Sequence, residues 1–143
     1  RVAAVTACSV EERGALEAVA IAYCRAVDRI GDVDGVLDLF SPDAIYDLSG
    51  IGMGEFAGHE GIRGFFEAAF PTMTHAAHYV SNFAVLAFDG PSAEAEGYVH
   101  AFARNVDGSM IDVKACYRFA FALDDAGWKI SGLSIRLLLP PAS

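Results

Sequence analysis

The sequence predicts a single α+β domain in which three helices come first and four long strands follow. Apolar residues recur every three or four positions in the first half of the chain, which is the spacing of helices with one buried face. From His75 onward, long segments rich in aromatic and branched residues are separated by short turn sequences, which is typical of antiparallel hairpins. This order favours a strongly curved sheet wrapped around helices, with a pocket between them.

The first helix is expected from Ser9 to about Val27. Ser9 followed by Glu12 is a capping-box signature, in which the two residues satisfy each other's free backbone N–H groups. The expected buried face of this helix consists of Leu16, Val19, Ala20, Tyr23 and Val27. The spacing of these residues predicts an amphipathic helix that packs against the sheet.

A second, short helix is expected because Asp32 or Asp34 can cap a segment that runs to Phe40 and ends before Pro42. Residues 44–48 then alternate as a short strand. A glycine-rich loop follows at 50–61, and a third helix carries Ile62, Phe65, Phe66 and Phe70 before Pro71. The four long strands are expected at 75–88, 93–105, 110–123 and 128–139.

Composition excludes several classes of function. The 143 residues fit one domain, which we expect to span 1–143. The 10 basic residues against 19 acidic ones give a net charge of −9, which disfavours nucleic acid as a partner. No apolar run reaches membrane-spanning length, so the protein is not expected to enter a membrane.

No metal or nucleotide cofactor is expected. Cys8, Cys24 and Cys116 form no CxxC or Cys/His pattern, so neither a disulfide framework nor a zinc site is indicated, and a reducing cytoplasm is the expected location. The glycine-rich loop has no GxGxxG or Walker pattern. We interpret it as a lip over the mouth of the pocket.

Apolar residues make up 54% of the chain and charged residues only 20%. This surplus of apolar surface indicates a lined cavity, a subunit interface or both. A small hydrophobic molecule and a second copy of the chain are therefore the expected partners.

Asp28 and His78 are the strongest candidates for chemistry. Asp28 lies in AYCRAVDRIGDVDGVLDLF at the end of the first helix, and His78 lies in THAAHYVSN early in a strand. A carboxylate that reaches an imidazole fixes its tautomer and stabilises its charged form, which produces a general base. If the fold brings the two together in an apolar cavity, the pair can abstract a proton without a cofactor.

The segments GDVDGVLDLFSPDAIYD, GHEGIRGFF, HYVSN and GWKISGLSIR resemble the NTF2-like, SnoaL-like superfamily, over most of the chain from Val10 to Leu138. The resemblance implies a cone-shaped curved antiparallel sheet, closed by three N-terminal helices around a deep cavity. The similar branch contains bile-acid 7α-dehydratase, hexachlorocyclohexane dehydrochlorinase and scytalone dehydratase, which use an Asp–His pair. The dehydratase-like relatives form trimers and other members of the superfamily form dimers, so the resemblance implies a homo-oligomer, with the trimer favoured.

The resemblance also implies site residues. Asp28 and His78 stand where the branch has its pair, Tyr23 matches a catalytic tyrosine, and Arg136 lies where the bile-acid enzyme has a functional arginine. Ala101 departs from the pattern, because an acidic residue of that enzyme aligns near it. The expected substrate-binding residues are His100, Tyr46, Phe56 and Phe66.

His100 is placed by its likeness to a second histidine of scytalone dehydratase. The alternation along its strand puts it one position out of phase with the cavity, and a β-bulge would correct this.

His78 is the expected base, Asp28 orients it, Tyr23 donates to a leaving hydroxyl or an oxyanion, and Arg136 holds an anionic group. Together they predict a cofactor-independent lyase (dehydratase) or isomerase for a small hydrophobic substrate, such as a steroid or polyketide. The alternatives are a non-catalytic hydrophobic-ligand-binding protein, an epoxide hydrolase or a polyketide cyclase of the same fold. A purely structural role also stays open for each of these four residues. Asp28 can cap the following helix, His78 and Tyr23 can be core residues, and Arg136 can form a surface ion pair.

Overall fold

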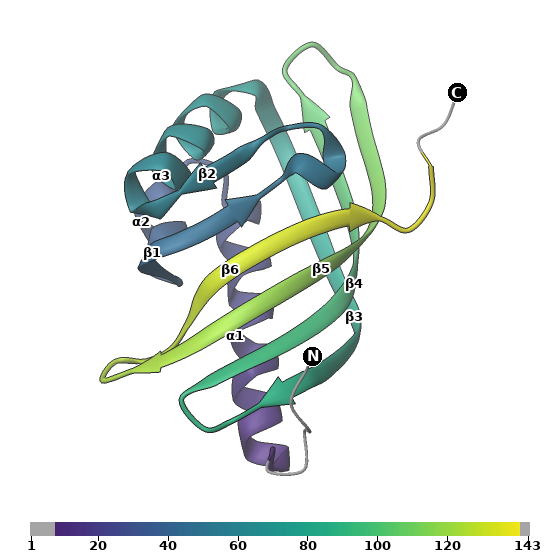
Figure 1. Ribbon diagram of the computed structural model, residues 1–143. Coiled ribbons are helices and arrows are strands. Elements are labelled where there is room, and N and C mark those ends of the chain that lie inside the picture. Colours follow the sequence, from purple (N-terminus) through teal and green to yellow (C-terminus); the bar gives the residue numbers. More distant parts are fainter. Residues whose placement is uncertain (1–7, 141–143) are drawn as a thin grey trace.

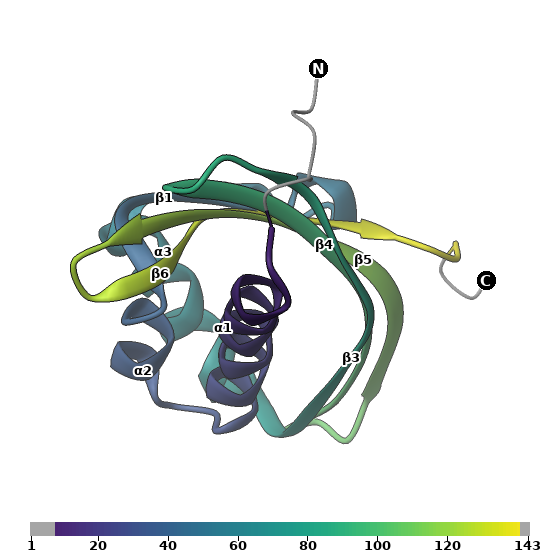
Figure 2. The same ribbon diagram turned by 90° about the horizontal axis from the view of Figure 1, so that it is seen from below.

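A curved six-stranded sheet wraps around the first helix of the protein in the computed structural model, which describes residues 8–140 (Figures 1 and 2). The helices are α1 (Val10–Asp28), α2 (Val33–Leu37) and α3 (Gly58–Ala69). The strands are β1 (Phe40–Asp47), β2 (Glu55–Ala57), β3 (Met73–Phe88), β4 (Ser92–Asn105), β5 (Met110–Asp124) and β6 (Gly127–Leu137). Short 3₁₀ turns lie at η1 (Ser49–Ile51) and η2 (Phe70–Thr72). The expected α+β class and the curved sheet with three helices before its long strands are confirmed.

The strands are ordered β2-β1-β6-β5-β4-β3 across the sheet. The four long strands pair antiparallel in sequence, as their hairpin turns require. One neighbouring pair of strands runs in the same direction: β1 is parallel to β6, with Tyr46 opposite Leu133. A hairpin dictates the direction of consecutive strands only, whereas β1 and β6 are brought together by tertiary packing.

Helix α1 lies inside the curve of the sheet, with α2 and α3 beside it (Figure 2). Its capping box is present: the Glu12 backbone N donates to Ser9 Oγ over 3.0 Å, and the Ser9 backbone N donates to Glu12 Oε1 over 2.9 Å. The face that it buries includes Leu16, Ala20, Tyr23 and Val27. The sequence periodicity therefore identifies the face of α1 that contacts the sheet.

Two boundaries differ from the sequence-based expectation. Helix α2 ends at Leu37, and Phe40 and Pro42 belong to β1. The pairing of β1 with β6 is irregular between Phe40 and Ile45, which accommodates a proline that has no N–H to donate. The glycine-rich loop contains η1 and β2, and α3 starts already at Gly58. Three residues are too few for a strand to be recognised from its alternation.

The prediction of one domain over 1–143 reaches beyond the described residues at both ends, and it stays a prediction. Among the helices of residues 8–140, none combines the length and the apolar character needed to span a membrane.

Candidate active site

Asp28 and His78 meet where the end of α1 packs on β3. His78 Nδ1 lies 2.5 Å from Asp28 Oδ1, and the backbone N–H of His78 donates to Asp28 Oδ2 over 3.1 Å. The side chain of His78 is 13% exposed and that of Asp28 is 24% exposed, so the pair is sheltered yet still reached by solvent. A neutral imidazole that donates from Nδ1 to a carboxylate carries its lone pair on Nε2, the form required of a base.

His78 is also part of the wall of a cavity of about 220 Å³ on the inner side of the sheet. On β4 its paired neighbour is Ala101, whose small side chain lines the same cavity. The apolar lining includes Val27, Leu48, Ile51, Phe65, Phe66, Met73, Ile111 and Ile135. Among the described lining residues there is no carboxylate, lysine or arginine. The ionisable groups among the described lining residues are therefore the His78 imidazole and tyrosine hydroxyls.

Two tyrosine hydroxyls form a second polar group in the cavity. Tyr23 on α1 and Tyr46 on β1 are buried, and their hydroxyl oxygens lie 2.5 Å apart, either one able to donate. Burial raises the pKa of Tyr23 well above its ordinary value, and the nearby Tyr46 and Tyr117 raise it further. Both rings line the cavity. Neutral tyrosines of this kind are hydrogen-bond donors to an oxygen that gains negative charge.

Tyr117 on β5 is a cavity residue that sequence reasoning missed. It is buried and lines the same cavity as His78, and burial raises the pKa of its hydroxyl well above the ordinary value. The available signal was the alternation of β5, in which Tyr117, Phe119 and Phe121 all face the interior.

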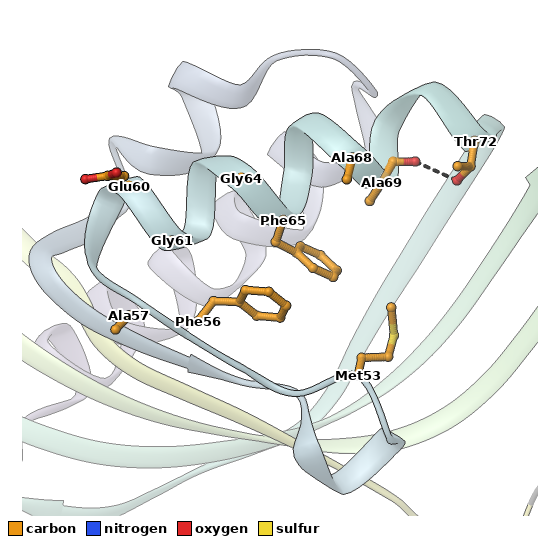
Figure 3. A pocket seen from close by; sticks show the side chains of 10 residues that line it. All are labelled: Met53, Phe56, Ala57, Glu60, Gly61, Gly64, Phe65, Ala68, Ala69 and Thr72. Carbon is orange, nitrogen blue, oxygen red and sulfur yellow. Dashed lines mark hydrogen bonds between the residues drawn. The ribbon is translucent and has the colours of Figure 1, made fainter.

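Of the expected substrate-binding residues, Tyr46 and Phe66 line the cavity. Phe56 does not, because β2 lies at the edge of the sheet and presents this ring to an outer groove between β2 and α3 (Figure 3). The Phe56 and Phe65 rings pack there with their centroids 5.0 Å apart.

The structure places Arg136 away from the cavity. Its neighbour Ile135 lines the cavity, and successive side chains of a strand point to opposite faces, so Arg136 is exposed on the outer face of β6. It lies there beside a shallow hollow that also contains Asp47, Glu96 and Arg118. The expected contact with an anionic substrate group therefore has no geometric basis in this arrangement.

His100 likewise faces outward. Its Nε2 lies 2.7 Å from Asp112 Oδ1 on the neighbouring strand. The register between β4 and β5 is unbroken, and His78 and Tyr79 pair in turn with Ala101 and His100. The β-bulge that would have turned His100 into the cavity is absent from this stretch of β4.

Residues 8–140 contain no group of three or more His, Cys, Asp or Glu side chains arranged to hold a metal ion. Cys8, Cys24 and Cys116 are free. For Cys24, which precedes Asp28 by one helical turn, burial and that carboxylate raise the pKa of the thiol to about 12. A thiol of this kind stays protonated and packs as a small apolar side chain.

Comparison with solved structures places this architecture among known proteins. A candidate aromatic ring hydroxylase from Novosphingobium aromaticivorans is 41% identical, with a TM-score of 0.92, and the match covers 93% of each chain. A candidate scytalone dehydratase from the same species is 18% identical, with a TM-score of 0.84 over 94% of this chain and 89% of the other. A hexachlorocyclohexane dehydrochlorinase from Novosphingobium barchaimii is 20% identical, with a TM-score of 0.79 over 94% and 92%. The last two likenesses show a shared fold.

No curated protein matches the chain. The SnoaL-like domain matches residues 9–134, which include all three helices and nearly the whole sheet. The expected resemblance to the NTF2-like, SnoaL-like superfamily is thereby confirmed, and the chain belongs to the SnoaL-like domain family.

Proposed function

We propose that the protein is a cofactor-independent lyase of the dehydratase type, or an isomerase, in which His78 is the general base. The observation that carries the proposal is the contact of His78 Nδ1 with Asp28 Oδ1 at 2.5 Å, with the same imidazole in the cavity wall. Asp28 orients the ring and stabilises the imidazolium that forms when Nε2 takes a proton.

The chemistry that suits this arrangement is proton abstraction from a carbon next to a carbonyl group. Negative charge then develops on the carbonyl oxygen, and the hydroxyl groups of Tyr23 and Tyr46 can donate to it or to a leaving hydroxyl. The electron pair left on carbon can form a C=C bond as a β-substituent leaves, either as halide or as hydroxide that takes the proton from the His78 imidazolium and departs as water. Alternatively, the imidazolium returns the proton to another carbon of the enolate. These two fates are elimination and isomerisation.

The lining of the cavity supports a hydrophobic substrate. It is mostly apolar and aromatic, and a low-dielectric site strengthens each hydrogen bond to a developing charge. The relative at 41% identity is named as a candidate aromatic ring hydroxylase. Its name supports a ring compound as the substrate class, and an apolar, aromatic lining suits such a compound. A steroid or polyketide ring falls within this class.

An epoxide hydrolase is less well supported. That reaction needs a water molecule held by two carboxylates and an arginine. No carboxylate lines the described cavity, and Arg136 lies on the outer face. A non-catalytic ligand-binding protein would use the same apolar walls, and it is separated from the enzyme by the experiment below.

The test is proton exchange and elimination on a panel of cyclic ketones and their β-hydroxy derivatives in D₂O, followed by mass spectrometry. The wild-type protein is expected to incorporate deuterium beside the carbonyl group or to release water. His78→Gln is expected to lower the rate by about 100-fold or more, the usual contribution of a general base. His75→Gln is the matched control, because His75 is an exposed histidine of the same strand. Full activity of His78→Gln would refute the proposal, and binding without any exchange by the wild type would favour the non-catalytic alternative.

We propose further that the protein acts in the cytoplasm as a homo-oligomer, with a trimer favoured over a dimer. Its free cysteines suit a reducing compartment. Tyr79 and Tyr98 are 62% and 41% exposed on the outer sheet face, a position where a second copy can cover them. Light scattering of the purified protein gives the mass of the assembly.

A further inference from the structure

The outer groove adjoins the cavity that contains His78. The groove lies between β2 and α3 and has a volume of about 810 Å³, against about 220 Å³ for the cavity (Figure 3). The residues that line both hollows are Met53, Phe65, Ala69 and Thr72. These four residues therefore form a wall that the outer groove and the inner cavity share.

Small residues on α3 hold the groove open. Gly61, Gly64 and Ala68 line it, and a Cβ atom added at Gly64 would meet no atom within 4 Å. Because a Cβ atom would fit at this exposed position, packing does not require glycine there. Helix stability does not favour glycine either, since glycine within a helix destabilises it by about 1 kcal/mol relative to alanine. What the missing side chain does provide is room along the helix surface.

The wall shared by the two hollows contains an exposed, unbranched side chain, Met53. Met53 is 51% exposed and lies between Gly52 and Gly54, whose φ angles of 78° and 86° are in the left-handed region that glycine tolerates. Methionine is unbranched and adapts to irregular spaces. In Figure 3 its side chain extends from the β2 side towards Ala69 and Thr72, across the end of the groove.

We propose that the groove binds the apolar tail of the same substrate whose reacting end lies in the cavity against His78. The inference rests on the proposed function, and it names the substrate class: an elongated, largely apolar molecule with its carbonyl group at one end. The cavity alone is smaller than the about 300–1,000 Å³ of usual ligand sites, and the adjoining groove supplies the missing volume.

The charge of the groove defines the far end of the tail. Glu60 is the one charged residue among those lining it, at the opposite end from Met53 and Thr72 (Figure 3). A terminal carboxylate or phosphate would lie near this carboxylate without a cationic partner from the lining. The tail therefore ends in a neutral group.

The experiment measures the affinity of methyl ketones whose second alkyl group lengthens from ethyl to decyl, by titration calorimetry. Affinity is expected to rise about three- to fourfold per methylene along the whole series, the gain for burying each group in an apolar site. A terminal carboxylate on the decyl chain is expected to weaken binding at least tenfold. Affinity that stops rising at short chains, or equal binding of the carboxylate, would overturn the inference.

Gly64→Leu and Ala68→Leu fill the groove from two positions outside the cavity, and neither is expected to hinder folding, since both lie on the exposed side of α3. Both variants are expected to lower the affinity for the decyl ketone at least tenfold and to leave the affinity for the ethyl ketone unchanged. Gly14→Leu is the matched control, because Gly14 is an exposed glycine of α1 with the same open surroundings. Long-chain affinity that survives both groove variants would refute the role of the groove.

The readout separates this inference from the proposed function. Binding is measured by heat, and catalysis by deuterium exchange beside the carbonyl group of the same ketones. Length-dependent binding that disappears in Gly64→Leu, without any exchange, would support the groove and contradict the base. Deuterium exchange without length-dependent binding would support His78 as the base and contradict the role of the groove.

Discussion

The Asp28 carboxylate contacts both the backbone N–H and the imidazole ring of His78. One carboxylate oxygen accepts the backbone N–H over 3.1 Å and the other lies 2.5 Å from Nδ1. The two bonds link the last residue of α1 to β3, 50 residues later in the chain. The carboxylate therefore sets the position of His78 on its strand as well as the orientation of its imidazole.

Asp28→Asn is expected to lower the exchange rate by about 100-fold while the protein stays folded. The asparagine oxygen can still accept one N–H of His78, but the amide no longer stabilises an imidazolium. The rate in D₂O and the ¹⁵N shifts of the His78 ring, which report its tautomer, check this. Asp43→Asn, at an exposed position of β1, is the control. An unchanged rate and tautomer in Asp28→Asn would contradict a role for the carboxylate.

The hydroxyl pair of Tyr23 and Tyr46 is expected to behave as one unit in unfolding experiments. Either single change to phenylalanine leaves a buried hydroxyl without its partner and is expected to lower the free energy of unfolding by about 1–3 kcal/mol. The double variant should lose less than the sum, with a coupling of about 0.5–3 kcal/mol. Urea denaturation of the four proteins measures this, with Tyr98→Phe as an exposed control. Additive losses would show that the two hydroxyls do not interact.

Stability is expected to fall in alkaline solution because of the buried tyrosines. Burial raises the pKa of Tyr117 well above its ordinary value of about 10, so the unfolded chain releases this proton first. The contribution is complete below about pH 10 and is lost as pH rises from there towards the folded-state pKa. Urea denaturation at increasing pH should show a negative slope that becomes shallower in Tyr117→Phe. A slope equal to that of the wild type would contradict the buried, neutral hydroxyl.

Arg136→Ala and His100→Ala are expected to change the exchange rate by less than about twofold, since both side chains lie on the outer face of the sheet. The two variants test the strand alternation directly, because the resemblance at the level of sequence implied a place for both residues in the site. Steady-state rates beside those of His78→Gln provide the comparison. A large loss in Arg136→Ala would show that the outer face takes part in catalysis.

Part of the candidate site was predictable from the sequence and part was not. Asp28 and His78 were recognisable because the segments around them carry a resemblance, and the structure brings the two together. Tyr23, Tyr46 and Phe66 line the same cavity, whereas Arg136, His100 and Phe56 do not. Strand parity decides these cases, and a shift of one residue moves a side chain to the opposite face. Alignment by resemblance is not accurate to one residue.

Signals that lie within a few residues were enough to predict the capping box and buried face of α1, the hairpin order of β3 to β6, and the α+β class. The parallel pairing of β1 with β6, the place of Tyr117 in the cavity of His78, and the groove beside this cavity at Met53 and Phe65 became visible in the folded chain alone. The two groups of features differ in the range of the interactions that produce them. Caps and turns are local hydrogen-bonding and steric choices, whereas strand partners and cavity walls arise from packing between segments far apart in the chain.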